Sequence, residues 1–371
     1  MRLSPQIPPL RQHLPSIALT AAAFGMSLGA AASTAPHSSE TTTVERAQFH
    51  MGTLLTIRIE ADDREASLSA SERVFQAVAA AEARLSTWTG VSDLARLNSA
   101  VSGYDVPIST QLVADLEVAK RCYELTGGAF DLSVGPLVSA WGLREGGRFP
   151  NPTELESARD AVGFEALEVG TSTARRTRDA LRLDEGAFGK GAGLDDASSA
   201  LATDPRVRSA VLDFGGQLLV YRREPSPGTA IRVLVAHPDD RQQNVSVLEL
   251  DSGSVATTGN GERAIEIDGE RLGHVLDPRS GRPAPDFGSL TVWVDSRFDR
   301  AGTLADCLST GLYVLGPDAA LAFAARHPGI EVLVAERVNE GIRVRKSSGL
   351  ASTSSKPPAT VTSSTWSVNP S

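Results

Sequence analysis

The region between residues 211 and 294 constrains the fold most, because its pattern predicts short strands and no helix. Gly, Pro and Asp residues separate these predicted strands, which are 211–214, 218–222, 231–236, 245–250, 264–267, 274–276 and 290–294. Helices are predicted on both sides of this region. Strand and helix therefore do not alternate regularly, as a doubly wound sheet requires. The pattern predicts an α+β fold.

The flanking segments have clearer periodicity. In the strand predicted at 53–60, Leu55, Ile57 and Ile59 alternate with polar residues. Ser69 and Glu72 have the spacing of a capping box, which predicts a helix from Ser69 to about residue 85. Three further helices are predicted, at 110–125, from the glycines around Lys190 to Leu201, and at 300–314.

We predict that the folded domain spans residues 45–345 and that the two ends of the chain lie outside it. Residues 1–32 combine Arg2 and Arg11 with an apolar run and end in alanines, as a cleaved signal peptide does. An uncleaved anchor is the alternative. No later segment is long and apolar enough to span a membrane, so we expect an exported, for example periplasmic, mature protein. The Ser/Thr/Pro-rich segment 346–371 is predicted to be a disordered tail.

Charge and cysteine content exclude some functions. The formal net charge is −9 and no basic block is present, so nucleic acid is not an expected partner. The chain has two cysteines, Cys122 and Cys307, in different sequence contexts. We expect buried free thiols, with a disulfide as the alternative, and two cysteines cannot build a zinc site.

A glycine-rich stretch, "LDEGAFGKGAGLDDA" at 183–197, surrounds Lys190. It is not a Walker A loop, because Gly191 stands where that motif has Ser or Thr. The glycine spacing also fails the dinucleotide fingerprint. A glycine-rich turn that opens a helix beside a lysine can still bind a phosphate through its N–H groups. The alternative is a turn whose glycines only allow close packing.

Two further groups of residues suggest chemistry. On the helix predicted at 300–314, Asp306, Ser309 and Thr310 share one face. A carboxylate and a hydroxyl one turn apart suit Mg²⁺, although an ordinary polar face has the same pattern. His274 ends the strand predicted at 274–276, before an Asp-Pro turn, where it could be a general base or a structural residue.

Together, these stretches resemble the ApbE family, the FAD:protein FMN transferases of the bacterial cell envelope. The matching stretches follow one another in the order of the family: "HMGTLLTI" (50–57), "EARLSTWTGVSDLARLNSA" (82–100), "TGGAFDLSVGPLVSAWGL" (126–143), "LDEGAFGKGAGLD" (183–195), "VLDFGGQLLV" (211–220), "ATTGNGER" (256–263), "HVLDPRSGRP" (274–283) and "ADCLSTGLYVLG" (305–316). An ordered set of this length is more specific than any single motif.

The resemblance implies mixed or antiparallel sheets with packed helices. It also implies a role for individual residues. The FAD-binding residues that it implies are Met51, Trp88, Ala129, Phe130, Asp131, Asp184, Lys190 and Leu276. The magnesium ligands that it implies are the Ala187 carbonyl, Asp306 and Thr310. Two positions depart from the common family pattern. Glu185 adds an acidic residue beside the expected phosphates, and Asn260-Gly261 stand where the family usually has an aromatic residue.

The resemblance also implies a reaction. FMN would pass from FAD to a Thr or Ser hydroxyl of an acceptor protein, with release of AMP. Our candidate catalytic residues are His274, Lys190 and Asp306. Lys190, together with the Mg²⁺ held by Asp306, would stabilise the charge that develops at the phosphates. His274 is the candidate for accepting the hydroxyl proton, although a metal-bound water or a carboxylate could do so instead. The acceptor would be an electron-transfer subunit with an S/T-G-A-S/T-like motif. An FAD pyrophosphatase and a non-catalytic flavin-binding or storage protein are the alternatives.

Overall fold

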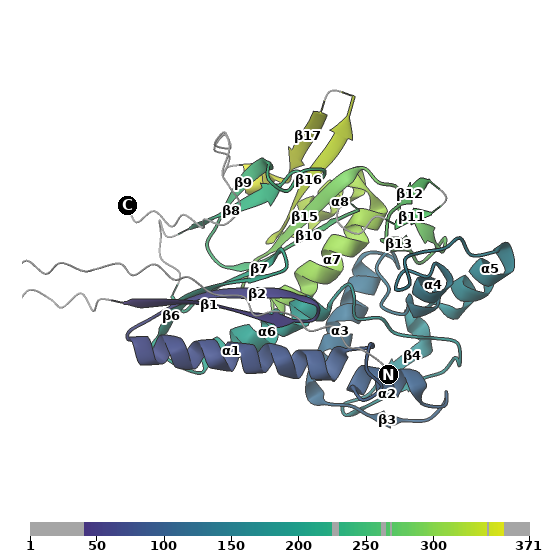
Figure 1. Cartoon of the computed structure of the whole chain (residues 1–371), viewed down its shortest axis with the longest axis horizontal. Helices are drawn as coiled ribbons and strands as arrows, with labels where there is room; N and C mark the ends of the chain where they lie inside the picture. The colour runs from purple at the N-terminus through teal and green to yellow at the C-terminus, as the bar shows by residue number, and fades with distance from the viewer. Residues whose placement is uncertain (1–40, 225–229, 261–264, 268, 340, 352–371) are drawn as a thin grey trace, which may run out of the picture. The chain divides into compact units, whose positions relative to one another are not determined.

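An eight-stranded antiparallel sheet forms the centre of the fold (Figure 1). Its strands lie in the order β1-β2-β6-β7-β10-β15-β16-β17. Their bounds are β1 Thr42–His50, β2 Thr53–Ala61, β6 Val207–Phe214, β7 Gln217–Arg222, β10 Gly253–Gly259, β15 Gly288–Val294, β16 Ile330–Val338 and β17 Gly341–Lys346. The computed structural model describes residues 41–224, 230–260, 265–267, 269–339 and 341–351. The α+β class predicted from the sequence is confirmed.

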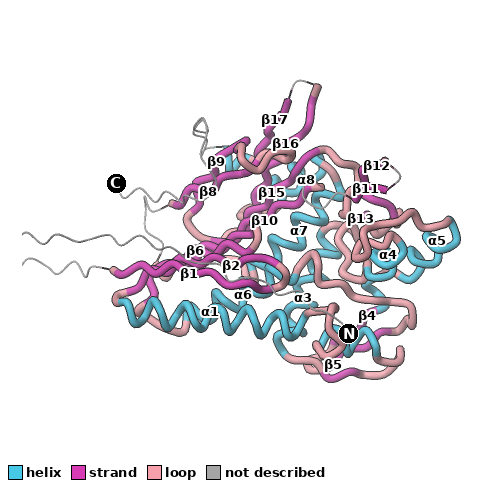
Figure 2. Tube along the Cα trace, viewed as in Figure 1, coloured by secondary structure: helices cyan, strands magenta, loops and turns pink. Residues whose placement is uncertain are grey.

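Helices cover one face of this sheet (Figure 2), and the shorter strands of the described residues form four small separate sheets. The helices are α1 Arg64–Leu85, α2 Asp93–Ser99, α3 Thr110–Leu125, α4 Gly135–Ala140, α5 Pro152–Ala161, η1 Phe164–Ala166, α6 Gly189–Ala202, α7 Ala301–Leu315, α8 Pro317–Arg326 and α9 Ser348–Ala351. The shorter strands are β3 Val106–Pro107, β4 Leu167–Val169, β5 Thr173–Arg176, β8 Ile231–Ala236, β9 Asn244–Leu250, β11 Ile265–Ile267, β12 Glu270–Leu272, β13 Leu276–Asp277 and β14 Arg282–Pro283.

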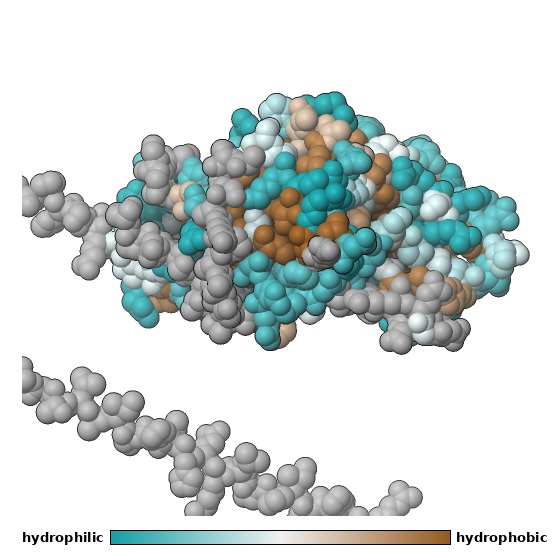
Figure 3. Space-filling view, turned by 90° about the horizontal axis from the view of Figure 1, so that it is seen from above, coloured by the Kyte–Doolittle hydropathy of each residue, from teal (hydrophilic) through white to brown (hydrophobic). Residues whose placement is uncertain are grey.

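The two faces of β16 show how the sheet is covered. Val332 and Val334 belong to the apolar cluster that contains α3 and α7. Leu333 and Ala335, which point the other way, belong to a second cluster with the β8–β9 hairpin. Seen from the side of this hairpin and β17 (Figure 3), a hydrophobic area lies among hydrophilic side chains. The sheet is therefore apolar on both faces in its C-terminal half.

Several elements differ from the sequence prediction. Helix α1 begins earlier, because the side chain of Asp63 caps it by accepting from Ala66 N at 2.7 Å. Ser69 lies inside that helix and accepts from Arg73 instead. The expected strand at 274–276 is β13, which starts only at Leu276. The elements that the sequence did not predict are β1, β3, β4, β5, β10, β12, β14, β16, β17, α2, α4, α5, η1, α8 and α9.

The two ends of the chain lie largely outside the described residues. The expected signal peptide at 1–32 and most of the expected tail, from residue 352 on, are not described. Residues 346–351, which the sequence assigned to the tail, belong to the folded part, since β17 reaches Lys346 and Leu350 of α9 is buried. Within the described ranges, no helix has the length and hydrophobicity that a membrane crossing requires.

Helices α6 and α7 cap each other with aspartates. Neither helix has a capping side chain on the residue before its first turn. Instead, Asp195 of α6 accepts from Gly302 N at 2.7 Å and from Thr303 N at 2.8 Å, in the first turn of α7. In return, Asp306 of α7 accepts from Gly191 N, in the first turn of α6, at 3.0 Å. All three bonds satisfy backbone N–H groups that a helix leaves without internal partners.

The first turns of these two helices touch through glycines. A Cβ atom on Gly191 would lie 2.3 Å from the Gly302 carbonyl oxygen, so only glycine fits there. Gln217, at the start of β7, donates to the same carbonyl oxygen at 2.9 Å. The glycine contact and the two aspartate caps together fix how α6 and α7 lie against each other.

A buried ionic cluster supports the start of α7. Arg300, just before the helix, has a left-handed backbone with φ of 53°, which costs a non-glycine residue about 1–2 kcal/mol. Its side chain pairs with Asp115 of α3, and its Nη1 lies 3.7 Å from Asp196 of α6. Arg84 of α1 contacts the same two carboxylates, at 3.0 and 2.8 Å. Burial raises the pKa of Asp115 and that of the capping Asp195, the latter to about 6.

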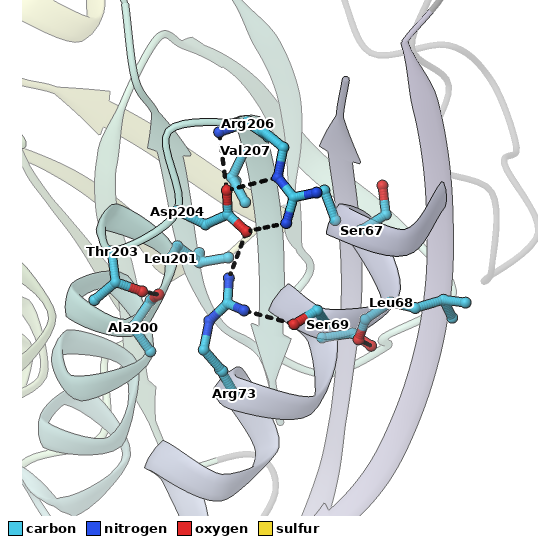
Figure 4. Close-up of polar contacts among 12 residues, drawn as sticks. Ser67, Leu68, Ser69, Arg73, Ala200, Leu201, Thr203, Asp204, Arg206 and Val207 are labelled. Atoms are coloured by element: carbon cyan, nitrogen blue, oxygen red, sulfur yellow. Dashed lines mark hydrogen bonds and ion pairs between the residues drawn. The ribbon is translucent and has the colours of Figure 1, made fainter. Parts of the chain in front are cut away.

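A second charged group ties the other end of α6 to α1 (Figure 4). Asp204 accepts from the Arg206 side chain at 3.1 and 3.0 Å and from Arg73 of α1 at 3.4 Å. The hydrogen bond from Arg206 is the main cause that lowers the pKa of Asp204 to about 2. Because this pKa is below its ordinary value of 3.8, the carboxylate stabilises the fold above about pH 4. That contribution is lost as the pH falls through 2.

We predict that Asp204→Asn lowers the free energy of unfolding at pH 7 by about 1 kcal/mol, since solvent reaches the two arginines that pair with this buried carboxylate. At pH 2.5 the difference between the two proteins should be clearly smaller, because the wild-type carboxylate is then partly protonated. Urea denaturation of both proteins at the two pH values measures this. An equal difference at both pH values would contradict the role of the charge.

We also predict that Gly191→Ala lowers the free energy of unfolding by about 3 kcal/mol, because its methyl group would overlap the backbone of α7. Gly193→Ala is the matched control on the same helix. A Cβ there would lie 3.5 Å from its nearest neighbour, the Met51 methyl group, which is ordinary contact. We expect Gly193→Ala to be neutral or to stabilise by up to about 1 kcal/mol. Similar thermal unfolding of both variants would show that the close approach is absent.

Candidate functional site

The residues at the junction of α6 and α7 combine opposite charges with limited solvent access. The Lys190 ammonium lies 3.8 Å from Oδ1 of Asp306, and the Asp306 side chain is 7% exposed. The other carboxylate oxygen, Oδ2, accepts from Gly191 N. The charge of Asp306 is thus held by the first turn of α6, where the helix dipole also favours a negative group. Oδ1 faces Lys190 at more than hydrogen-bond distance, so it keeps acceptor capacity.

The other expected metal ligands lie on the same two elements. Thr310 is one turn after Asp306 on α7, and its hydroxyl is 3.4 Å from the Asp306 carbonyl oxygen. Ala187 is partly buried in the turn that leads into α6. Ser309 does not share this role, because it donates to the Asp306 carbonyl and bonds Thr258 of β10 at 2.8 Å. Ser309 therefore ties α7 to the sheet.

Hard oxygen atoms are the ligands that Mg²⁺ prefers, and it needs few from the protein when phosphates supply the rest. In the described part of the chain, no three His, Cys, Asp or Glu side chains form a group that could hold a metal. A site here would contain the Asp306 carboxylate, the Thr310 hydroxyl and the Ala187 carbonyl. These donors fit Mg²⁺ better than a metal that prefers sulfur or imidazole.

Met51 reaches this junction from the β1–β2 hairpin. Met51 and Gly52 form its two-residue turn with φ of 46° and 73°, as a type I′ turn requires. Met51 is an unfavourable residue for the first position, and its N–H donates to Glu82 of α1 at 2.9 Å. Its side chain approaches α6 at Gly189 and Gly193. The strained turn thus places a flexible apolar side chain beside the start of α6.

Trp88 and Asp184 meet through an arginine that the sequence did not single out. Arg144, in the turn after α4, donates to Asp184 at 2.6 Å. Its guanidinium carbon lies 4.6 Å from the centre of the Trp88 ring. Trp88 is 71% exposed, so a large aromatic surface is open to solvent. Asp184 also accepts from Gly186 N at 2.9 Å, which shapes the turn before α6.

Ala129, Phe130 and Asp131, which the resemblance implies contact FAD, are all buried in the protein interior. Ala129 and Phe130 are each 1% exposed in the main apolar cluster. Asp131 is buried and accepts from Ser133 and from Phe164 N, and burial raises its pKa. The side chains of these three residues therefore make their contacts within the protein interior. Their FAD contacts stay a prediction.

Leu276 begins β13, and His274 lies just before this strand. Leu276 is buried in an apolar cluster with residues of α4 and α5. His274 is half-buried in the loop between β12 and β13, not at a strand end as expected. The neighbouring Gly273 packs on Asn260, which donates to the Tyr313 hydroxyl of α7 at 3.1 Å. The His274 loop is therefore fastened to the C-terminal half of α7.

Several residues that position this site were not predicted from the sequence. Asp195, Gln217, Arg144 and Glu82 act through contacts with distant segments, which spacing along the chain does not reveal. One signal was present for Asp195, because an acidic residue follows the small and apolar run 191–194 of a helix. Such a residue in a buried helix face indicates a charge with a specific partner.

The expectation for the two cysteines is confirmed. Cys122 and Cys307 are both free and fully buried. Although they are far apart in the sequence, their side chains meet between α3 and α7, and burial raises the pKa of the Cys307 thiol. Neither thiol is exposed for chemistry at the surface.

Comparison with known proteins shows which proteins this chain is similar to over most of its length. The chain is 30% identical over 270 residues to the FAD:protein FMN transferase of Vibrio cholerae, covering 71% of this chain and 78% of that protein. It is 30% identical over 325 residues to the Klebsiella pneumoniae FAD:protein FMN transferase, covering 85% and 90%. The structure matches the apo form of the Pseudomonas stutzeri flavinyl transferase ApbE with a TM-score of 0.72 at 26% identity, covering 84% of this chain and 97% of that one.

A model of one family matches nearly all of the folded region. It describes the ApbE family and matches residues 51–334, which include the Met51 turn, the glycine-rich turn, the His274 loop and helix α7. The fold agrees with this match, since it is similar to that of a solved ApbE flavinyl transferase. This chain belongs to the ApbE family.

Proposed function

We propose that this protein is a Mg²⁺-dependent enzyme that transfers FMN from FAD to a Ser or Thr hydroxyl of another protein and releases AMP. Its membership of the ApbE family and the transferase names of its relatives support the flavin transfer. The observation that carries the proposal is the meeting of Lys190 and Asp306 at the capped starts of two helices. A cation and hard oxygen atoms side by side suit a pyrophosphate with its metal.

The residues of the junction would have two separate roles. Lys190 would contact the phosphates of FAD, while Asp306, Thr310 and the Ala187 carbonyl would hold Mg²⁺. The ion supplies positive charge that stabilises the transition state of phosphoryl transfer. Asp306 can do this without losing its position, because Gly191 N already holds one of its oxygens at 3.0 Å.

The proposed transfer needs no reactant other than FAD and the acceptor protein. The hydroxyl oxygen of the acceptor bonds to the phosphorus on the FMN side of FAD. The bond from that phosphorus to the bridging oxygen breaks, and AMP leaves with this oxygen. The hydroxyl proton passes to a base. His274 is our candidate base, since its loop is joined to α7 through Asn260 and Tyr313.

FAD would lie across the surface that connects Trp88, Asp184, Lys190 and Met51. Trp88 is exposed, and Met51 reaches the same end of α6. An acceptor protein is the natural second substrate, and a short motif of the S/T-G-A-S/T type is what we expect it to present. Export to the periplasm would place the enzyme with such acceptors.

Product analysis separates the proposal from its alternatives. We predict that the purified protein, given FAD, Mg²⁺ and an acceptor domain with such a motif, yields AMP and an acceptor heavier by the mass of FMN less water. Mass spectrometry detects both products. FMN and AMP formed equally with and without the acceptor would indicate a pyrophosphatase, and the absence of any turnover would indicate a flavin-binding protein.

The metal ligands can be tested by substitution. We predict that Asp306→Asn reduces the rate of FMN transfer about 10²–10³-fold, because it removes charge at the reacting phosphates. Asparagine keeps an oxygen that can accept from Gly191 N, so the helix junction should stay folded. Thr310→Ala should lose less, since water can replace a neutral hydroxyl ligand.

The control is Asp318→Asn on α8, where the carboxylate is 93% exposed. Transfer rates are measured across a Mg²⁺ titration for all three variants, with circular dichroism to verify folding. A folded Asp306→Asn protein with the wild-type rate and wild-type Mg²⁺ dependence would rule out the metal site.

A further inference from the structure

Three side chains from separate segments converge behind Trp88. Glu185, in the glycine-rich turn, accepts from both the hydroxyl and the backbone N–H of Thr87, at 2.5 and 3.2 Å. Arg144 donates to the same Thr87 hydroxyl at 2.7 Å and lies 3.8 Å from Glu185. We call Thr87, Arg144 and Glu185 the Trp88 clasp. It joins the loop after α1, the turn after α4 and the turn before α6.

The Thr87 hydroxyl both donates and accepts a hydrogen bond within the clasp. A hydroxyl has one hydrogen to donate and lone pairs to accept. Thr87 gives its hydrogen to Glu185, which as a carboxylate only accepts, and receives one from Arg144, which only donates. The threonine hydroxyl thus links a cation to an anion. Neither a valine nor an alanine at this position could make both bonds.

Solvent does not weaken these contacts as it would at an open surface. The Arg144 side chain is 27% exposed, and those of Asp184 and Glu185 are each 14% exposed. Burial, and then the neighbouring Asp184, raise the pKa of Glu185. Arg144 offsets the repulsion between these two carboxylates. Charged contacts that are this shielded contribute more than ordinary surface ion pairs.

The clasp holds an aromatic ring that still has a free surface. The Arg144 guanidinium lies 4.6 Å from the centre of the Trp88 ring. Nevertheless, 71% of Trp88 is exposed. A tryptophan fixed by a cation but open to solvent is suited to stack on a planar ring. The same clasp connects it to Asp184 and to the turn that leads to Lys190.

We propose that Thr87, Arg144 and Glu185 are positioning residues that hold Trp88 ready to stack on a planar ring of FAD. This inference rests on the proposed function, since it assumes that FAD binds along this surface. Binding to a fixed ring avoids the entropy loss of ordering a loop and its side chains. The clasp therefore acts on FAD affinity and not on the phosphoryl-transfer step.

The test compares Thr87→Val with Thr87→Ser. Valine has the shape of threonine but no hydroxyl, whereas serine keeps the hydroxyl that joins Glu185 to Arg144. We expect Thr87→Val to raise the dissociation constant of FAD about three- to tenfold, in line with the usual cost of ordering side chains and loops on binding. Turnover at saturating FAD should stay near the wild-type value. Thr87→Ser should restore the affinity.

A second measurement follows the clasp without FAD. The backbone N–H of Thr87 donates to the Glu185 side chain, so we expect Glu185→Leu to speed hydrogen exchange at this amide. Glu72→Leu, at a side chain that is 55% exposed on α1, is the matched control and should leave this exchange unchanged.

The outcomes distinguish the clasp from the function on which it rests. Flavin fluorescence titration of the wild-type protein tests FAD binding itself, and a failure to bind FAD would overturn the proposed function. If the wild type binds FAD, equal affinity of Thr87→Val and the wild type would overturn the clasp. Thr87 exchange that is unchanged in Glu185→Leu, or weak binding by Thr87→Ser, would also overturn it.

Discussion

Each of the two helices that carry the proposed catalytic groups has its first turn capped by an aspartate of the other. Asp195 holds the start of α7, and Asp306 holds the start of α6. Because these three bonds cross the same junction, neither helix can shift without leaving buried N–H groups unsatisfied, which is costly. The glycine contact between Gly191 and Gly302 brings the backbones close enough for this exchange. The distance between the side chains of Lys190 and Asp306 therefore depends on this glycine contact and on the two aspartate caps.

The junction concentrates unfavourable features that the rest of the fold offsets. Arg300 and Met51 adopt left-handed backbone conformations, and the carboxyl groups of Asp115 and Asp195 are buried. Arg84 and Arg300 compensate the carboxylates, and Glu82 bonds the strained hairpin turn. Strain and buried charge of this kind persist only where the surrounding structure fixes them. Asp306 has two uses here, since the carboxylate that caps α6 is also the proposed metal ligand.

The sequence predicted what is local and missed what is distant. The strand at 53–60, the helix at 110–125 and the helix at 300–314 have strong periodicity or end signals, and the structure has them within a few residues. β16 was missed because both its faces are buried, so it lacks alternation. Asp63 was missed as a cap because Ser69 offered a better-known motif. Residues such as Arg144 could not be found from spacing, because their partners are distant in sequence and meet only in the fold.

The central claim is that the junction of α6 and α7 binds the FAD pyrophosphate with its metal. Crystals of the protein grown with FAD and Mn²⁺ test this most directly, because Mn²⁺ gives an anomalous signal that locates the ion. We predict one ion about 2.1 Å from an Asp306 carboxylate oxygen, the distance typical of Mg²⁺ sites, with the pyrophosphate between this ion and Lys190. An ion and pyrophosphate bound elsewhere, with Asp306 contacting only Gly191 N, would contradict the account.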